Sequence, residues 1–245
     1  MTKSKLLDTL ILILIYIGIS CLPFSWFVSG TLLYIFQILA QFVIFFLFKL
    51  VLKKSPLNFK ERQYNRLNMI LFIPVFILCF SNFFNLLNPS VTFNFSWSLE
   101  LSLSIPLCFC VAFNEEYLFR CVIIDNLDSS EKPIVKIIIS ASIFAACHLT
   151  SFFSTFNPVQ LIMVVYTFGL GIVLGLMYVY GECLWYCVLF HFAYNVINGE
   201  FARRFIFYTE SDYSYYLINA LVGLVVAAYL VAIYFLKLKQ KKVEE

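Results

Sequence analysis

The chain has 245 residues, of which 62% are hydrophobic and only 13% are charged, with a formal net charge of +3. A soluble domain carries roughly 25% charged residues, so this composition excludes an ordinary soluble protein. Apolar runs of about 20 residues, the length that crosses a bilayer as a helix, recur along the chain. The absence of a basic stripe excludes a nucleic-acid partner. We therefore expect an all-α, polytopic membrane protein in contact with membrane lipid.

The apolar runs predict about eight transmembrane helices. The first run is long for the core of a signal peptide, and no cleavage site of small residues follows it. Pro74 predicts a kink in the third helix. The predicted spans are residues 10–27, 31–52, 67–87, 98–124, 133–153, 159–180, 184–198 and 216–236.

Lysines and arginines between the spans predict the orientation of the helices. They gather at the N-terminus, in the 53–66 loop, in the 125–136 region and in the 237–242 tail, whereas Arg203 and Arg204 lie on the other side. The positive-inside rule then predicts that both termini are cytoplasmic. The short loops and small size favour a multi-pass protein of a bacterial plasma membrane.

Three charged side chains, Glu115, Glu116 and Arg120, stand at the end of the fourth predicted span. A charge at the centre of a membrane helix costs roughly +2.5 to +3.5 kcal/mol, so such groups either pair or take part in chemistry. On a helix, Glu116 and Arg120 are four residues apart and can form an ion pair. Glu115 points about 100° away and has no partner in its own helix. The sequence therefore separates a structural pair from a carboxylate that is available for chemistry.

The chain contains two histidines, His148 and His191, and both lie inside predicted spans. An ionisable residue in a membrane segment indicates a functional site. Asn195 follows His191 by one helical turn. Together with Glu115 these residues supply a base, two imidazoles and an amide, the groups that activate a water and stabilise an oxyanion. A single membrane histidine is more often a packing residue, and Asn195 could equally bridge two helices.

The depths of the two histidines differ. His148 lies about 15 residues into its span, or ~22 Å at 1.5 Å per residue, whereas His191 lies about 7 residues into its own. They meet only if the fifth helix begins at the membrane interface or is strongly tilted.

Gly171 and Gly175 form a G-x-x-x-G face on the sixth span, which permits close approach of a neighbouring helix. We interpret this face as helix packing, and expect it to bring the sixth span against the seventh, which carries His191.

Eight cysteines lie in or beside apolar runs, and no C-x-x-C pair exists. We expect free, buried cysteines rather than a disulfide or zinc framework. The eight cysteines are Cys21, Cys79, Cys108, Cys110, Cys121, Cys147, Cys183 and Cys187.

Cys187 lies one helical turn before His191. A thiol peptidase with Cys187 as its nucleophile is therefore a further alternative.

Four motifs occur in order, and the set is more specific than any one of them. It resembles the motif set of the CPBP family, the CAAX-type and bacteriocin-processing intramembrane proteases, also called the Abi family. The resemblance covers about residues 99–198, and includes the stretch 181–191 that leads into the last motif. The motifs are Glu115-Glu116-x-x-x-Arg120, Phe144-x-x-x-His148, Phe168-x-x-Gly171-x-x-x-Gly175 and His191-x-x-x-Asn195.

The resemblance implies an endopeptidase buried in the membrane, with its site open toward the cytoplasmic half, acting on a membrane-associated peptide or protein. Carried over by position, Glu115 would activate the attacking water with help from His148. His191 and Asn195 would bind or polarise the scissile carbonyl, and the Glu116–Arg120 pair would hold the shape of the site.

The resemblance leaves the role of a metal open. Glu115, His148 and His191 could hold one divalent ion such as zinc, with a water in the fourth position. Glu115 could equally act without a metal, as a desolvated carboxylate base, and we favour this reading. No H-E-x-x-H helix is present.

We expect the catalytic core at residues 99–198, after N-terminal helices in 1–98 and before a loop, a last helix and a basic tail in 199–245. The main alternative function is a non-catalytic membrane protein of bacteriocin self-immunity. A transporter is a further alternative, but no inverted repeat supports it.

Overall fold

The computed structural model describes residues 3–20, 22, 24–53, 70–88, 91–128, 130–149, 159–208 and 214–234. These residues form an all-α protein with one pair of very short strands. The predicted basic loop at 54–66, the connection at 154–158, the tail at 237–242 and Cys21 lie outside the described residues.

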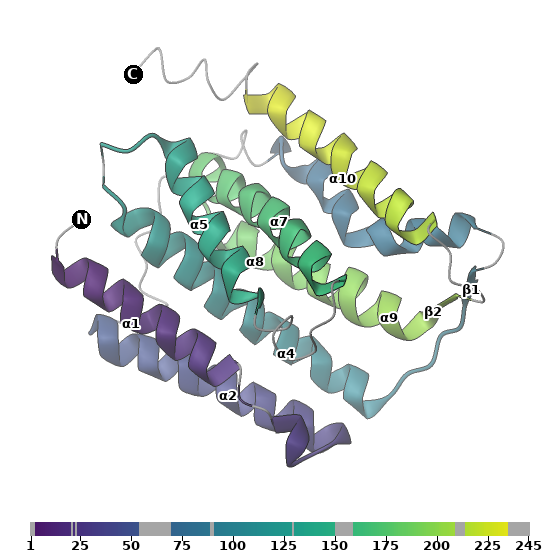
Figure 1. Ribbon diagram of the computed structural model, residues 1–245. Coiled ribbons are helices and arrows are strands. Elements are labelled where there is room, and N and C mark those ends of the chain that lie inside the picture. Colours follow the sequence, from purple (N-terminus) through teal and green to yellow (C-terminus); the bar gives the residue numbers. More distant parts are fainter. Residues whose placement is uncertain are drawn as a thin grey trace.

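The N-terminal helices α1 (Lys3–Ser20) and α2 (Gly30–Leu52) lie side by side along one side of the molecule (Figure 1). A short 3₁₀ turn, Phe24–Trp26, belongs to their connection. Large apolar side chains such as Leu14 and Phe46 are exposed on their outer faces. An exposed apolar surface of this kind fits a lipid environment.

The predicted third span differs from a kinked α-helix. Residues Ile73–Leu87 form a 3₁₀ helix, η2, and Pro74 lies in its first turn. Proline is tolerated there because the first N–H groups of a helix have no intrahelical acceptor. The kink at Pro74 stays a prediction, because residues 67–69 of this predicted span lie outside the described residues.

Helix α4 (Leu99–Glu116) begins at Ser98, whose hydroxyl accepts the backbone N–H of Leu101 at 3.1 Å. This is the N-cap arrangement that serine favours. The chain then widens into a π-helix, η3 (Tyr117–Ile124). The predicted fourth span is thus helical over its predicted length, and its charge cluster lies at the α-to-π junction.

Helix α5 (Pro133–Cys147) packs against α7 (Val159–Gly181), and the two glycines of α7 make this contact. A Cβ added to Gly171 would lie 3.0 Å from the Cα of Ala141, and one added to Gly175 would lie 2.7 Å from Cγ2 of Ile137. The glycine face therefore packs on the helix that precedes His148. The expectation that it faces the seventh span is wrong, although α7 and α8 do contact each other through other residues.

The seventh predicted span is longer than expected. It starts after a turn at Glu182, which has a left-handed φ of 58°. It then runs through α8 (Leu184–Ala193), the π-helix η4 (Tyr194–Phe201) and α9 (Ala202–Phe205).

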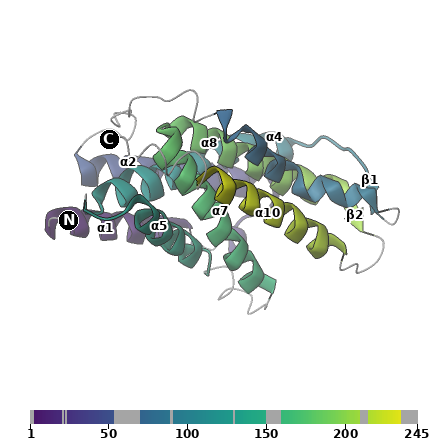
Figure 2. The same cartoon turned by 90° about the horizontal axis from the view of Figure 1, so that it is seen from above.

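Two short strands, β1 (Val91–Phe93) and β2 (Ile206–Tyr208), pair antiparallel, with Val91 opposite Tyr208. The sequence analysis expected connections at both places. The pair lies at the end of the molecule far from the start of α1 (Figure 2). The last helix, α10 (Ser214–Ile233), packs against η2.

Within the described residues, three helices are long and apolar enough to cross a membrane: Lys5–Trp26, Gly30–Leu52 and Val164–Gly181. Two shorter apolar helices are Ile73–Leu87 and Pro133–Cys147. The described cysteines form no disulfide; Cys79, Cys147 and Cys187 are buried as expected, whereas the other described cysteines are half-buried. The protein is a helical membrane protein, whose buried core gathers α4, α5, α7 and α8.

Candidate active site

The predicted ion pair forms at the start of η3. Arg120 Nε lies 2.8 Å from Glu116 Oε2, and both side chains are fully buried. Arg120 Nη1 also donates to Ser140 Oγ on α5 at 3.0 Å, and its guanidinium lies 5.5 Å from the ring centre of Phe144. This arginine therefore joins η3 to α5 in addition to neutralising a carboxylate.

His191 lies between the two glutamates. Its Nδ1 is 2.8 Å from Glu116 Oε1, and its Nε2 is 3.5 Å from Glu115 Oε2. The first distance is a hydrogen bond, whereas the second is longer than the 2.7–3.2 Å typical of N–H···O contacts. The His191 side chain is 5% exposed. Helices α4 and α8 thus bring the first and last motifs together at atoms that can exchange protons.

Glu115 has a partner that the sequence analysis missed. The hydroxyl of Tyr16, on α1, donates a hydrogen bond to Glu115 Oε1. Both side chains are buried. The signal available in the sequence was weak: Tyr16 is the one hydroxyl-bearing aromatic residue in an otherwise aliphatic run of leucines and isoleucines.

His148 follows the last residue of α5 and contacts Phe144, which also lies against His191. Its Nδ1 lies 2.9 Å from the backbone oxygen of Phe144, and the two rings are 4.9 Å apart. The ring of His191 lies 6.0 Å from the same phenylalanine. Phe144 therefore lies against both histidines, and His148 makes no hydrogen bond with Glu115. Helix α5 begins at Pro133, so His148 still lies 15 residues along it, and the interfacial or tilted start of this helix stays a prediction.

Asn195 is half-buried in η4, and its side chain makes no hydrogen bond among the described residues. Three residues later, Asn198 is buried and makes several. Its Oδ1 accepts from Ser81 Oγ at 3.0 Å and from the backbone N–H of Asn82 at 2.7 Å, and its Nδ2 donates to Tyr194 at 2.9 Å. The amide that bridges helices is therefore Asn198, which the sequence analysis did not single out.

Both motif helices change geometry immediately after their chemical residues. Helix α4 becomes a π-helix one residue after Glu116, and α8 becomes one three residues after His191. Short π-helical segments are frequent at functional sites, because the wider turn re-aims side chains.

The metal alternative can be tested against the residues present. Within the part of the chain that the structure describes, no three His, Cys, Asp or Glu side chains lie close enough together to hold a metal ion. One nitrogen of His191 is engaged by Glu116, and His148 bonds to a backbone oxygen. Glu115, His148 and His191 thus do not fit a three-ligand zinc site in this arrangement.

Cys187, one turn before His191, makes its hydrogen bonds with backbone oxygens. Its Sγ approaches the backbone oxygens of Leu174 at 3.5 Å and of Cys183 at 3.7 Å, and the side chain is fully buried. This arrangement is that of a packing cysteine and gives no support to a thiol nucleophile.

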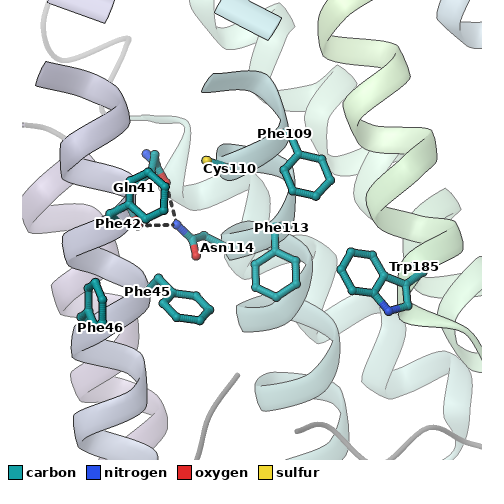
Figure 3. A pocket seen from close by; sticks show the side chains of 9 residues that line it. All are labelled: Gln41, Phe42, Phe45, Phe46, Phe109, Cys110, Phe113, Asn114 and Trp185. Atoms are coloured by element: carbon teal, nitrogen blue, oxygen red, sulfur yellow. Dashed lines mark hydrogen bonds between the residues drawn. The ribbon is translucent and has the colours of Figure 1, made fainter. Parts of the chain in front are cut away.

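An apolar pocket of about 260 Å³ opens beside the site between α2, α4 and α8 (Figure 3). Asn114, which lines it, donates to the backbone oxygen and to Oε1 of Gln41, at 3.0 and 2.9 Å. Neither histidine nor either motif glutamate lines the pocket. The lining residues are Gln41, Phe42, Phe45, Phe46, Phe109, Cys110, Phe113, Asn114 and Trp185.

One comparison with known proteins found a match. The family model described as type II CAAX prenyl endopeptidase Rce1-like matches residues 96–197. No curated protein and no solved structure matches the chain. The matched segment contains all four motifs and every charged residue of the site described above, from Glu115 to His191. This match confirms the resemblance of residues 96–197 to the CPBP family of CAAX proteases.

Proposed function

We propose that this protein is an intramembrane endopeptidase that hydrolyses a peptide bond in a membrane-associated peptide or protein. One observation carries the proposal: Glu115 Oε2 lies 3.5 Å from His191 Nε2, in a buried place. Membership of a family of membrane-embedded proteases supports the same reaction.

In the proposed reaction, Glu115 takes a proton from a water molecule, and the resulting hydroxide adds to the carbonyl carbon of the scissile bond. His191 Nε2–H and the amide of Asn195 donate to the oxyanion that forms. When the tetrahedral intermediate collapses, Glu115 returns the proton to the leaving amine. His148 assists the water from the far side of Phe144.

The charge balance favours a doubly protonated His191. Both of its ring nitrogens face carboxylate oxygens. With an imidazolium, the two glutamates, Arg120 and His191 sum to zero charge. A neutral imidazole would leave one uncompensated negative charge in a buried site, which is costly. The imidazolium is also the form that can donate to an oxyanion from Nε2 while Nδ1 is held by Glu116.

The proposal places this site in a multi-pass protein of a bacterial plasma membrane, with about eight spans and both termini in the cytoplasm. The catalytic core is residues 99–198, and the segments 1–98 and 199–245 flank it. The environment of Arg204 supports the topology. This arginine lies on the predicted external side, and its charge is paired with Glu200 at 3.2 Å and Glu100 at 3.8 Å.

The apolar pocket suits the apolar part of a membrane-associated substrate. It lies beside Asn114, the residue before Glu115, and phenylalanines from α2 and α4 make up most of its wall. The matching family is described as a prenyl endopeptidase. A prenyl chain and a run of apolar side chains are thus the two occupants to compare.

The test is cleavage by the purified protein in detergent. Two substrates are offered, a prenylated peptide with a CAAX end and an apolar leader-type peptide, and the products are identified by mass spectrometry. Glu115→Gln keeps the shape of the side chain and removes the base, so we expect the rate to fall roughly 10²- to 10⁴-fold. Glu131→Gln, an exposed loop glutamate, is the matched control and keeps full activity.

The alternative, bacteriocin self-immunity without catalysis, predicts a different result. A binder keeps its protective effect in cells when Glu115 becomes glutamine, provided that the protein folds. Protection retained by Glu115→Gln, with no cleavage by the wild type, would overturn the peptidase proposal.

A further inference from the structure

The buried face of α1 is a single stripe aimed at the catalytic domain. Among residues 5–20, the buried side chains are Thr9, Leu12 and Tyr16. Positions i, i+3 and i+7 lie on one side of a helix. The other side chains of residues 5–20 are half-buried or exposed, and Thr9 and Tyr16 of this stripe contact the helix formed by α4 and η3 and its C-terminal end.

Two hydrogen bonds fix how α1 lies along that helix. Asn126 Nδ2 donates to Thr9 Oγ1 at 3.2 Å near the start of α1, and Tyr16 donates to Glu115 two turns later. These pairs set α1 antiparallel to the α4–η3 helix. An edge-to-face contact with Phe119, at 6.2 Å between ring centres, holds the ring of Tyr16 in place.

The two oxygens of Glu115 therefore have different surroundings. Oε1 accepts from Tyr16, whereas Oε2 faces His191 Nε2 at 3.5 Å without a close hydrogen bond. A carboxylate can rotate about its terminal bond, and this torsion is broad and soft. The phenol is the contact that keeps Oε1 turned away and Oε2 turned toward His191.

We propose that Tyr16 is a positioning residue for the reaction: it holds Glu115 so that Oε2 faces His191 and the water to be activated. This inference rests on the proposed function. It also means that the active site is completed by the first helix, because Tyr16 lies outside the matched residues 96–197.

The variant Tyr16→Phe removes the hydroxyl and keeps the ring. Because the phenol acts on the base and not on the substrate, we expect kcat to fall roughly 10-fold, while KM stays within about 2-fold. The matched control is Tyr178→Phe. Tyr178 is also buried, and its hydroxyl donates to a carboxylate, Asp125 Oδ2, at 2.8 Å. Its loss removes the same kind of bond away from Glu115, so the control keeps wild-type kcat.

A second comparison separates positioning from general support of the fold. In the Glu115→Gln background there is no base to orient, so adding Tyr16→Phe leaves the residual cleavage rate unchanged within about 2-fold. A merely structural role would lower the rate by the same factor in both backgrounds. The melting temperature in detergent is recorded for every variant.

The outcomes are distinguishable. If Glu115→Gln is inactive but Tyr16→Phe matches the wild type, the proposed function stands and the role of Tyr16 is overturned. Equal losses of kcat in Tyr16→Phe and Tyr178→Phe overturn it as well. If the wild type cleaves neither peptide, the proposed function fails first, and the role of Tyr16 fails with it.

Discussion

Arg120 is a fully buried charged residue held by three partners. It is fully buried and binds Glu116, Ser140 and the face of Phe144. Removing one partner of a buried ion pair leaves an uncompensated charge, which costs about 3–5 kcal/mol.

We therefore expect Arg120→Met to lower the melting temperature in detergent strongly, and Glu116→Gln combined with Arg120→Met to recover part of the loss. Lys132→Met, at an exposed loop position, is the control and leaves the melting temperature unchanged. Additive losses in the double variant would contradict the pairing.

The two asparagines of η4 offer a contrast between stability and chemistry. Asn198 is buried and joins η2 to η4 through Ser81 and Asn82. Asn195 is half-buried, and its side chain makes no hydrogen bond among the described residues.

Asn198→Ala should lower the melting temperature, because it leaves buried donors without an acceptor, at a cost of about 1–3 kcal/mol. Asn195→Ala should leave the melting temperature nearly unchanged and lower kcat, because its amide is assigned to the oxyanion. Thermal unfolding and cleavage rates of both variants check this. Loss of stability in Asn195→Ala with unchanged kcat would contradict the assignment.

At the residue scale, the sequence predicts contacts between residues that are close in the chain. The Glu116–Arg120 pair follows from a spacing of four residues on one helix, and the geometry confirms it. The bond between Tyr16 and Glu115 joins residues 99 positions apart, so it depends on how α1 packs, which no local pattern encodes. Asn198 was missed for the same reason, since its partners lie on η2.

At the scale of the helices, Gly175 of α7 packs closely against Ile137 of α5. A methyl group on Gly175 would lie 2.7 Å from Ile137 Cγ2, which is too close without movement of α5. Gly169, on the same helix, has nothing within 4 Å.

Gly175→Ala should therefore destabilise the protein by about 1–3 kcal/mol through overpacking. It should also lower activity, because a shift of α5 would move Phe144 and His148, which lie at its C-terminal end. Gly169→Ala should be neutral or slightly stabilising, because alanine is a better helix former than glycine. Melting temperatures of the two variants make the comparison, and equal values would contradict the packing described here.

The G-x-x-x-G pattern predicted a close helix contact but not its partner. The glycine spacing shows which face of α7 can approach another helix closely. It does not show whether α5 or α8 packs on that face. The π-helical segments after Glu116 and His191 were also beyond the sequence analysis, because the hydrophobic pattern of the two spans fits an ordinary α-helix.

For the whole molecule, composition was sufficient to predict the fold class. A chain with 62% hydrophobic residues and 13% charged residues has to place much of its apolar surface against lipid. The strand pair β1–β2 was not predicted, because three-residue strands carry no periodic signal. Four short motifs predicted the candidate site residues, and the structure brings Glu115, Glu116, Arg120 and His191 into contact.

The central claim is that Glu115 is the base of a peptidase. The most direct measurement is the single-turnover cleavage rate with enzyme in excess over the peptide, which separates the chemical step from product release. The account predicts that Glu115→Gln lowers this rate roughly 10²- to 10⁴-fold while Glu131→Gln leaves it unchanged. A wild-type rate in Glu115→Gln would contradict it.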